Sequence, residues 1–224
     1  MREIVIDTET TGLNFKSGDR IIEVGCVELK NHIPTGETIQ FYCKPDRKIS
    51  EGAKNIVGIS DEFLEKQKTF KENHKLLLDF IKADTLIIHN SEFDLGFINN
   101  ELSLINLPPL TNPIVDTVSL ARKVLNTRVA NLDYLCRRFN IDLSDRSFHG
   151  ALLDSQLLAA VYLELRGGKQ FSMELNSNID EKNTQINNKN ETKTKIIEVN
   201  KEDYLAHKEM LKKLKNPLWK KFNY

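Results

Sequence analysis

Residues 4–13 read IVIDTETTGL, and this stretch combines a buried-strand pattern with two closely spaced acidic residues. Its first three residues are β-branched and apolar, as expected for a short strand that is buried on both faces. The threonine and glycine at residues 11–12 are typical of a turn and bound this run. We therefore expect Asp7 and Glu9 to lie at the end of a strand in the core of the protein.

Further strand and helix patterns extend over the first 168 residues of the 224-residue chain. Alternating or continuous apolar runs predict more strands, at residues 20–30, 38–44, 86–88 and 114–115. Helical spacing of apolar residues predicts helices at residues 70–82, 93–105, 117–125, 131–139 and 150–166. We expect residues 31–36, with Pro34, to form the turn of a hairpin. Early strands followed by alternating strands and helices indicate an α/β fold with a mixed sheet flanked by helices.

The bulk composition is that of an ordinary globular protein. Lysine plus arginine and aspartate plus glutamate each number 32, which argues against a module that binds DNA nonspecifically through bulk charge. The three cysteines are odd in number and form no CxxC pair, which argues against a disulfide framework or a thiolate zinc site. The chain shows neither a signal-peptide pattern nor an apolar run approaching the ~18 residues of a membrane span. We therefore expect a cytoplasmic protein that does not contact a membrane.

The composition changes after residue 168, where we place the end of the folded domain. Residues 176–190 contain six asparagines and almost no large apolar side chains, so they cannot bury enough surface to offset the entropy lost on ordering. We expect residues 169–200 to be a flexible, disordered linker. The C-terminal segment, residues 201–224, mixes lysines with large apolar side chains, and its first half has the pattern of a helical turn or two.

Asp7 and Glu9 are separated by one residue, so in a strand their side chains point to the same side of the sheet. Two carboxylates buried together repel each other and lose hydration, and divalent cations would offset both costs. Carboxylate oxygens are the ligands that Mg²⁺ and Mn²⁺ prefer. An acid pair at this spacing is also common in solvated turns, so this motif alone is weak evidence for a metal site.

Asp94 follows the predicted strand at residues 86–88 and falls near the start of the next helix. An acid in this position is favoured by the helix dipole, so capping of the helix is an alternative explanation for it. Because sites in open α/β folds gather where strands end, Asp94 is also a candidate metal ligand.

His149 and Asp154 are close in sequence at the start of the predicted helix at residues 150–166. Asp154 lies in a mostly apolar run, where a carboxylate needs a partner. A histidine side chain can accept a proton from water, so His149 is a candidate base, although a lone histidine is more often structural. Together the four acids could hold two divalent cations, Mg²⁺ or Mn²⁺, which clamp both the attacking and the leaving oxygen of a phosphodiester. The sequence contains neither a P-loop nor a GxSxG nucleophile motif.

These motifs, in this order, resemble the three exonuclease motifs of the DEDDh superfamily of 3′→5′ exonucleases. The motifs are IDTETTGL at residues 6–13, HNSEFD at residues 89–94 and HGALLD at residues 149–154. The resemblance covers the whole domain at residues 1–168 and implies a ribonuclease H-like α/β fold with a five-stranded mixed sheet. It also implies that His149 is the general base and that the metal ligands are Asp7, Glu9, Asp94 and Asp154.

Within this superfamily the chain resembles the family of proofreading epsilon subunits of bacterial DNA polymerase III, on the evidence of ANLDYLCRRFNI at residues 130–141 and RSFHGA at residues 146–151. The resemblance implies hydrolysis of a single-stranded or frayed 3′ DNA end in a bacterial replisome, with release of nucleoside 5′-monophosphates. The residues expected to contact this DNA end are Thr8, Thr10, Gly12, Leu13, Gly58, Ile59, Asn90 and Phe93. Leu13 and Phe15 are candidates for a wedge against the terminal bases. The sequence has Val57 before Gly58 and Ile59, where the family often has histidine.

The C-terminal part carries two stretches that resemble partner-binding peptides of this family. QFSMEL at residues 170–175 resembles a peptide that binds the sliding clamp, with contacts expected from Gln170, Met173 and Leu175, although so short a match can arise by chance. The lysine-rich end is similar to the segment that docks onto the polymerase III alpha subunit, with Leu218 and Trp219 as apolar anchors. A nonspecific basic tail that touches DNA is the alternative.

Two other functions fit parts of this pattern. A DEDDh exoribonuclease that trims the 3′ ends of RNA would share the pocket residues, but it needs neither a linker nor a docking peptide. A catalytically inactive adaptor that joins clamp and polymerase would need only the C-terminal part. All five catalytic positions nevertheless hold the residue types that activity requires, which favours the enzyme.

Overall fold

The computed structural model describes residues 1–144, 146, 148–167 and 200–213. The chain divides into two units, Met1–Glu174 and Leu175–Tyr224, and each is treated by itself. Residues 169–199 of the expected linker, with Gln170, Met173 and Leu175, lie outside the described residues. So do residues 214–224 of the expected docking segment, with Leu218 and Trp219. None of the helices in the described part is long and apolar enough to cross a membrane.

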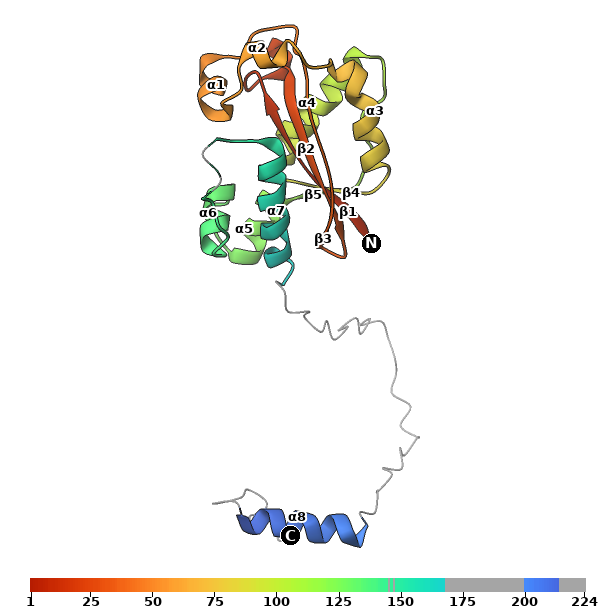
Figure 1. Ribbon diagram of the computed structural model, residues 1–224, viewed down its shortest axis with the longest axis vertical. Helices are drawn as coiled ribbons and strands as arrows, with labels where there is room; N and C mark the ends of the chain where they lie inside the picture. The colour runs from red at the N-terminus through yellow and green to blue at the C-terminus, as the bar shows by residue number, and fades with distance from the viewer. Residues whose placement is uncertain (145, 147, 168–199, 214–224) are drawn as a thin grey trace, which may run out of the picture. The chain divides into compact units, whose positions relative to one another are not determined.

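A mixed five-stranded sheet forms the centre of the first unit (Figure 1), as the sequence predicts. The strands are β1 (Arg2–Thr10), β2 (Ile21–Lys30), β3 (Ile33–Tyr42), β4 (Thr85–Ile88) and β5 (Ile114–Asp116). Their order is β3-β2-β1-β4-β5, with antiparallel pairing among the first three and parallel pairing of β1 with β4 and of β4 with β5. β1 therefore lies at the centre and is paired on both sides.

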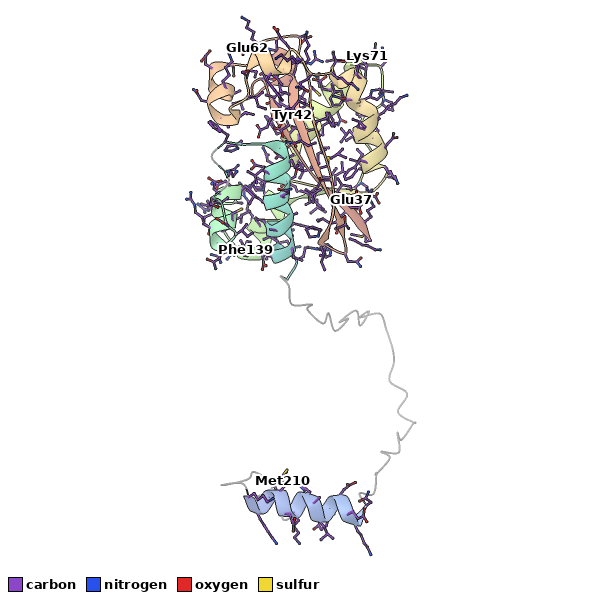
Figure 2. All side chains as sticks on the ribbon, in the orientation of Figure 1. Glu37, Tyr42, Glu62, Lys71, Phe139 and Met210 are labelled. Atoms are coloured by element: carbon purple, nitrogen blue, oxygen red, sulfur yellow. The ribbon has the colours of Figure 1, made fainter. Side chains whose placement is uncertain are left out.

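The helices of the first unit are α1 (Glu51–Val57), α2 (Asp61–Leu64), α3 (Phe70–Ile81), α4 (Ser91–Leu104), α5 (Thr117–Leu125), α6 (Leu132–Arg138) and α7 (Ala151–Leu165), with a 3₁₀ turn, η1 (Phe15–Ser17). Two hydrophobic clusters separate the helices from the two faces of the sheet. α3 and α4 cover one face, whereas α5, α6 and α7 cover the other (Figure 1). Phe139, labelled in Figure 2, directly follows α6 and packs against the second cluster.

The side chains of β1 alternate between these two clusters. Ile4 and Ile6 pack beneath α3 and α4, whereas Val5 packs beneath α5, α6 and α7. This is the pattern of a strand that is buried on both faces. Asp7 and Glu9 follow Val5 at intervals of two residues, so the strand directs both carboxylates to the side covered by α7.

The hairpin between β2 and β3 differs from the expected one. The turn consists of Asn31 and His32, which both have positive φ angles, 52° and 68°, as two-residue hairpin turns require. β3 begins at Ile33, so the expected turn at residues 31–36 is wrong and Pro34 is part of the strand. A proline is tolerated there because β3 is an edge strand, where the missing N–H does not interrupt a central ladder.

Three short elements of the first unit were not expected from the sequence: η1, α1 and α2. α1 is fixed at its ends rather than by its apolar pattern, because the Ser50 side chain accepts from the Ala53 N–H and Gly58 ends the helix with φ of 72°. Ser60 begins α2 in the same way. A small cluster of Ile22, Ile49, Val57 and Leu64 anchors both helices to β2.

The second unit contributes one described helix, α8 (Lys201–Lys213). It is longer than the helical turn or two expected for this region. Acidic residues in its first turn and lysines in its last turn match the helix dipole. Tyr204, Leu205 and Met210 are exposed on it.

Candidate active site

Asp7 and Glu9 lie in the last part of β1, which continues to Thr10, as the sequence predicts. Both side chains are partly buried. Thr8, between them, points to the opposite face and is buried there. One central strand thus presents acidic groups to the α7 side and a hydroxyl to the α4 side.

Asp94 reaches this site from the first turn of α4. Its side chain is buried, and Oδ1 accepts hydrogen bonds from the Thr8 backbone N–H at 3.0 Å and from the Thr8 hydroxyl at 2.7 Å. The N-cap position of α4 belongs to Asn90. Asp94 is therefore bound to the central strand, and capping of its own helix does not account for its position.

Asp154 reaches the site from α7, which three contacts hold close to β2. Gly25 leaves room for the helix, since a Cβ atom added there would lie 2.2 Å from the backbone nitrogen of Leu152. The Ser155 hydroxyl donates to the Gly25 carbonyl at 2.9 Å. The buried Glu23 carboxylate accepts from the backbone N–H groups at the start of α7. These contacts set the distance between Asp154 and β1.

Arg146 forms a side-on ion pair with Asp154. Its Nε donates to Oδ1 and its Nη2 to Oδ2, both at 2.6 Å, and its Nη1 also donates to Asp133 on α6. This pair supplies the partner that the apolar surroundings of Asp154 require.

His149 is carried by the loop between α6 and α7, named here the catalytic loop (residues 140–150). Its side chain is 46% exposed, and Nδ1 lies 3.4 Å from Asp154 Oδ2. The loop is attached to α1, because the His149 backbone N–H donates to the Ile56 carbonyl at 2.9 Å. Phe148 packs on Gly58, where an added Cβ would lie 2.8 Å from its ring.

The electrostatics of the site favour a bound cation. Burial raises the pKa of Asp7 well above its ordinary value, and the charges of Asp94, Glu9 and Asp154 raise it further. Burial and the charge of Asp154 raise the pKa of Glu9 to about 8, and burial raises the pKa of Asp94 to about 7 against the opposing hydrogen bonds from Thr8. Carboxylates that repel one another in this way are relieved by protons or by hard divalent cations.

The donor set also fits such a cation by geometry. Glu9, His149 and Asp154 each offer one ligand atom, and these atoms all lie within 4.8 Å of one another. The two carboxylate oxygens of this set, from Glu9 and Asp154, are ligands that suit Mg²⁺ or Mn²⁺.

Two cavities adjoin the acids. The larger, of about 600 Å³, is lined by Glu9 and by five of the residues expected to contact the substrate: Thr8, Thr10, Gly12, Leu13 and Phe93. Its lining does not include Gly58, Ile59 or Asn90; Val57 lines it instead, and Gly58 contacts Phe148. The smaller, of about 380 Å³, contains Asp7, His149 and Asp154 together with Arg146.

Of the two expected wedge residues, Leu13 and Phe15, only the first is exposed, at 85%. Phe15 packs edge-on against Phe97 at 5.5 Å between ring centroids and against Gly96, so it belongs to the core beneath α4. Phe15 is half-buried by these contacts, so its ring is less available than Leu13 to a bound strand.

The sequence did not indicate some residues of the site. Arg146 stands in the stretch that carries the resemblance, but arginine has no fixed place in the three motifs. His89 lines the smaller cavity, is buried enough to lower its pKa, and its Nδ1 lies 2.9 Å from the Thr117 hydroxyl. Arg47 and Asp19 line the larger cavity and pair with each other at 3.1 Å. The position of His89 directly before Asn90 in the second motif is the one signal that could have found it.

Comparisons with known proteins agree with this geometry. The family model described as Exonuclease matches residues 4–162. DNA polymerase III subunit epsilon of Rickettsia felis is 44% identical over 220 residues, which cover 94% of this chain and 96% of that protein. The protein of the same name from Escherichia coli K12 is 44% identical over 184 residues, 77% of this chain and 76% of that protein.

Solved structures share the fold at low sequence identity. The nuclease domain of 3′hExo, a DEDDh family member bound to rAMP, has a TM-score of 0.65 at 22% identity over 74% of this chain and 92% of that chain. A complex of E. coli exonuclease I with single-stranded DNA has a TM-score of 0.66 at 19% identity over 74% of this chain and 41% of that chain. The expected ribonuclease H-like exonuclease fold is thus confirmed. The chain belongs to the Exonuclease family and, within it, to the family of DNA polymerase III epsilon subunits.

Proposed function

We propose that this chain is the proofreading 3′→5′ exonuclease of a bacterial DNA polymerase III and removes single nucleotides from the 3′ end of DNA. The observation that supports this most strongly is that Asp7 feels the charges of Glu9, Asp94 and Asp154, carried by β1, α4 and α7, and that His149 lies beside Glu9 and Asp154. The family membership agrees with it.

In this proposal Asp7, Glu9, Asp94 and Asp154 hold two divalent cations, Mg²⁺ or Mn²⁺. When bound, the cations would polarise the scissile phosphate and stabilise the attacking and leaving oxygens. Thr8 keeps Asp94 against β1 through two hydrogen bonds, and the close packing of α7 on β2 keeps Asp154 opposite Glu9. The protein thus supplies a rigid frame for a reaction that depends on placement.

His149 accepts the proton of the attacking water. It suits this role because its imidazole is partly exposed and lies beside Asp154, within reach of a water bound at the site. The leaving group is the 3′ oxygen of the shortened strand, so the product is a nucleoside 5′-monophosphate.

The terminal nucleotide occupies the larger cavity beside Glu9. Thr8, Thr10, Gly12, Leu13 and Phe93 are proposed to contact it, and exposed Leu13 is proposed to separate the terminal base from its neighbour. Gly58, Ile59 and Asn90 stay expected contacts that DNA would bring into reach. A mispaired end unpairs at lower cost than a paired one, which makes it the preferred substrate.

The experiment that tests the function uses the full chain with 5′-labelled single-stranded DNA and with RNA of the same sequence. With Mg²⁺ or Mn²⁺ the DNA should shorten stepwise from its 3′ end and faster than the RNA, and EDTA should abolish this. Asp7→Asn should remove the activity while the protein stays folded by circular dichroism. Faster degradation of RNA would favour the exoribonuclease, and an intact substrate would favour the inactive adaptor.

The partners proposed for the C-terminal part are the polymerase III alpha subunit and the sliding clamp. The relatives are named as subunits of DNA polymerase III, and the sequence at residues 170–175 and 201–224 has the composition of docking segments. Binding of the full chain to alpha should be lost with Trp219→Ala, and binding to the clamp should be lost with Gln170→Ala. Unchanged affinities would contradict these assignments.

A further inference from the structure

We propose that Arg146 is an exchangeable counter-ion of the site: it holds Asp154 while no divalent cation is bound and releases this carboxylate when a cation binds. This role presupposes the metal site proposed above. It adds to that site a residue that stands outside the three motifs.

The ion pair engages the oxygens that a cation would need. Nε and Nη2 of Arg146 each donate to a different oxygen of Asp154 at 2.6 Å, so both carboxylate oxygens are occupied. The two side chains are 8% and 6% exposed, so the pair is held out of water. A buried carboxylate needs a counter-charge, and the guanidinium supplies it in the absence of metal.

The same guanidinium determines which ring nitrogen of His149 carries the proton. Its Nη2 lies 3.0 Å from Nδ1 of the imidazole. A guanidinium has only donors, so in this contact Nδ1 must accept and the proton of the neutral ring must be on Nε2. Neither ring nitrogen can then take a proton from water: one lone pair is engaged and the other nitrogen already carries hydrogen. While Arg146 holds Asp154, the proposed base is inactive.

Arg146 also has a second carboxylate to which it can remain bound. Its Nη1 donates to Asp133 in the first turn of α6, whose side chain is 46% exposed. Asp133, Arg146, His149 and Asp154 all line the smaller cavity of about 380 Å³. The guanidinium can therefore leave Asp154 and His149 by a movement within this cavity and keep one ion pair.

The Arg146 guanidinium and the divalent cation compete for the Asp154 carboxylate, and this competition lowers the observed affinity for the cation. Cation binding must break the pair with Arg146, so the pair weakens the observed cation affinity and stabilises the cation-free protein. Removing the guanidinium should reverse both effects, because Asp154 is then free for the metal but unpaired without it.

The test is the Arg146→Gln variant of the full chain, with Mn²⁺ binding measured by calorimetry in the absence of DNA. We expect Mn²⁺ to bind about tenfold more tightly than to the unsubstituted chain, since a unit positive charge near the site is removed. The melting temperature in EDTA should fall, and this deficit should shrink with saturating Mn²⁺. Arg138→Gln, which removes the same charge from an exposed position at the end of α6, should change neither quantity appreciably.

The outcomes separate this role from its alternatives. Weaker Mn²⁺ binding by Arg146→Gln, or an equal loss of melting temperature with and without Mn²⁺, would make Arg146 a permanent support and overturn the proposal. No Mn²⁺ binding to the unsubstituted chain would instead refute the metal site itself.

Two further measurements keep the proposal testable if Arg146→Gln unfolds in EDTA. Arg146→Lys keeps the charge but cannot bond both oxygens at once, so its Mn²⁺ affinity should lie between those of the other two proteins. The imidazole ¹⁵N shifts of His149 should report an Nε2-protonated ring without Mg²⁺ and a different state with it. Shifts that do not respond to Mg²⁺ would contradict the release of His149.

Discussion

Thr8 and Asp94 form a two-point contact across the central strand: both the backbone N–H and the hydroxyl of Thr8 donate to the same carboxylate oxygen, Oδ1. The residue between the two β1 acids thereby holds a third acid that comes from α4. The second oxygen of Asp94 stays available to a ligand. The contact orients a side chain that would otherwise be repelled by Asp7.

The first prediction concerns this contact. Thr8→Val removes the hydroxyl but keeps the branched shape, so one of the two hydrogen bonds to the buried Asp94 is lost. We expect the free energy of unfolding to fall by about 1 kcal/mol. We expect kcat to fall by about tenfold, the effect typical of a residue that orients a metal ligand, which is the role proposed for Asp94. Urea unfolding and steady-state hydrolysis measure the two effects. Thr38→Val, at an exposed position of β3, is the control and should leave both unchanged.

The second prediction concerns pH in the absence of metal. Folding raises the pKa of Glu9 from 4.5 to about 8 and the pKa of Asp94 from 3.8 to about 7. Between the unfolded and folded pKa values of each group, the folded protein therefore binds more protons than the unfolded chain. Stability in EDTA should therefore be highest near pH 4–5 and decline as the pH rises through 7 and 8. Thermal unfolding at pH 5.5 and 8.5 measures this, and saturating Mn²⁺ should flatten the decline. A stability that rises with pH in EDTA would contradict the raised pKa values.

The third prediction separates stability from activity at Asp7. Asp7→Asn removes one buried ionisable group, and with it the cost of keeping that group among repelling carboxylates. We expect activity to be lost, whereas the melting temperature in EDTA should rise by about 2–4 °C, the shift typical of about 1 kcal/mol in a domain of this size. Asp154→Asn is the matched comparison and should lower the melting temperature, because it leaves Arg146 without its main partner. Equal effects of the two variants would contradict this account of the charges.

The fourth prediction concerns the spacing between α7 and β2. Gly25→Ala would place a methyl group 2.2 Å from the backbone of α7, so the helix and Asp154 must move. We expect a loss of about 1–3 kcal/mol in the free energy of unfolding, together with weaker Mn²⁺ binding. Gly52→Ala adds a methyl group where nothing lies within 4 Å, and it should not lower stability. An unaffected Gly25→Ala protein would show that α7 can shift without cost.

Much of the fold is readable from local patterns in the sequence. The apolar run at Ile4, Val5 and Ile6 predicts the central strand, because a strand that is buried on both faces consists of consecutive apolar residues. Apolar residues at helical spacing predict α3, α4, α5, α6 and α7, because each of these helices buries one face. The hairpin turn was misplaced because Pro34 is usually a turn residue. An edge strand that tolerates proline can be recognised only when the order of the strands is known.

The residues of the candidate site are likewise of two kinds: some stand in sequence motifs, and others are identified only by their contacts in the folded chain. Asp7, Glu9, Asp94, His149 and Asp154 stand in local motifs, and the structure brings them to one place. Arg146 and Glu23 act on the site through contacts made only in the folded chain, where the arginine meets Asp154 and the glutamate meets the start of α7. Such pairs leave no periodic pattern, so one sequence cannot reveal them.

Because β1 is the central strand, it should be among the last parts of the domain to unfold. Amides of this strand are bonded to β2 on one side and to β4 on the other, so they exchange with solvent only when the whole domain unfolds. Phe148 and His149 are held outside the sheet, by the His149–Ile56 bond and the Phe148–Gly58 contact, with Arg146 paired to Asp154 and Asp133 beside them, so they can detach at lower cost than the strand. On warming, His149, the proposed base, should leave the site while the acidic groups stay assembled, and cooling should restore activity without refolding.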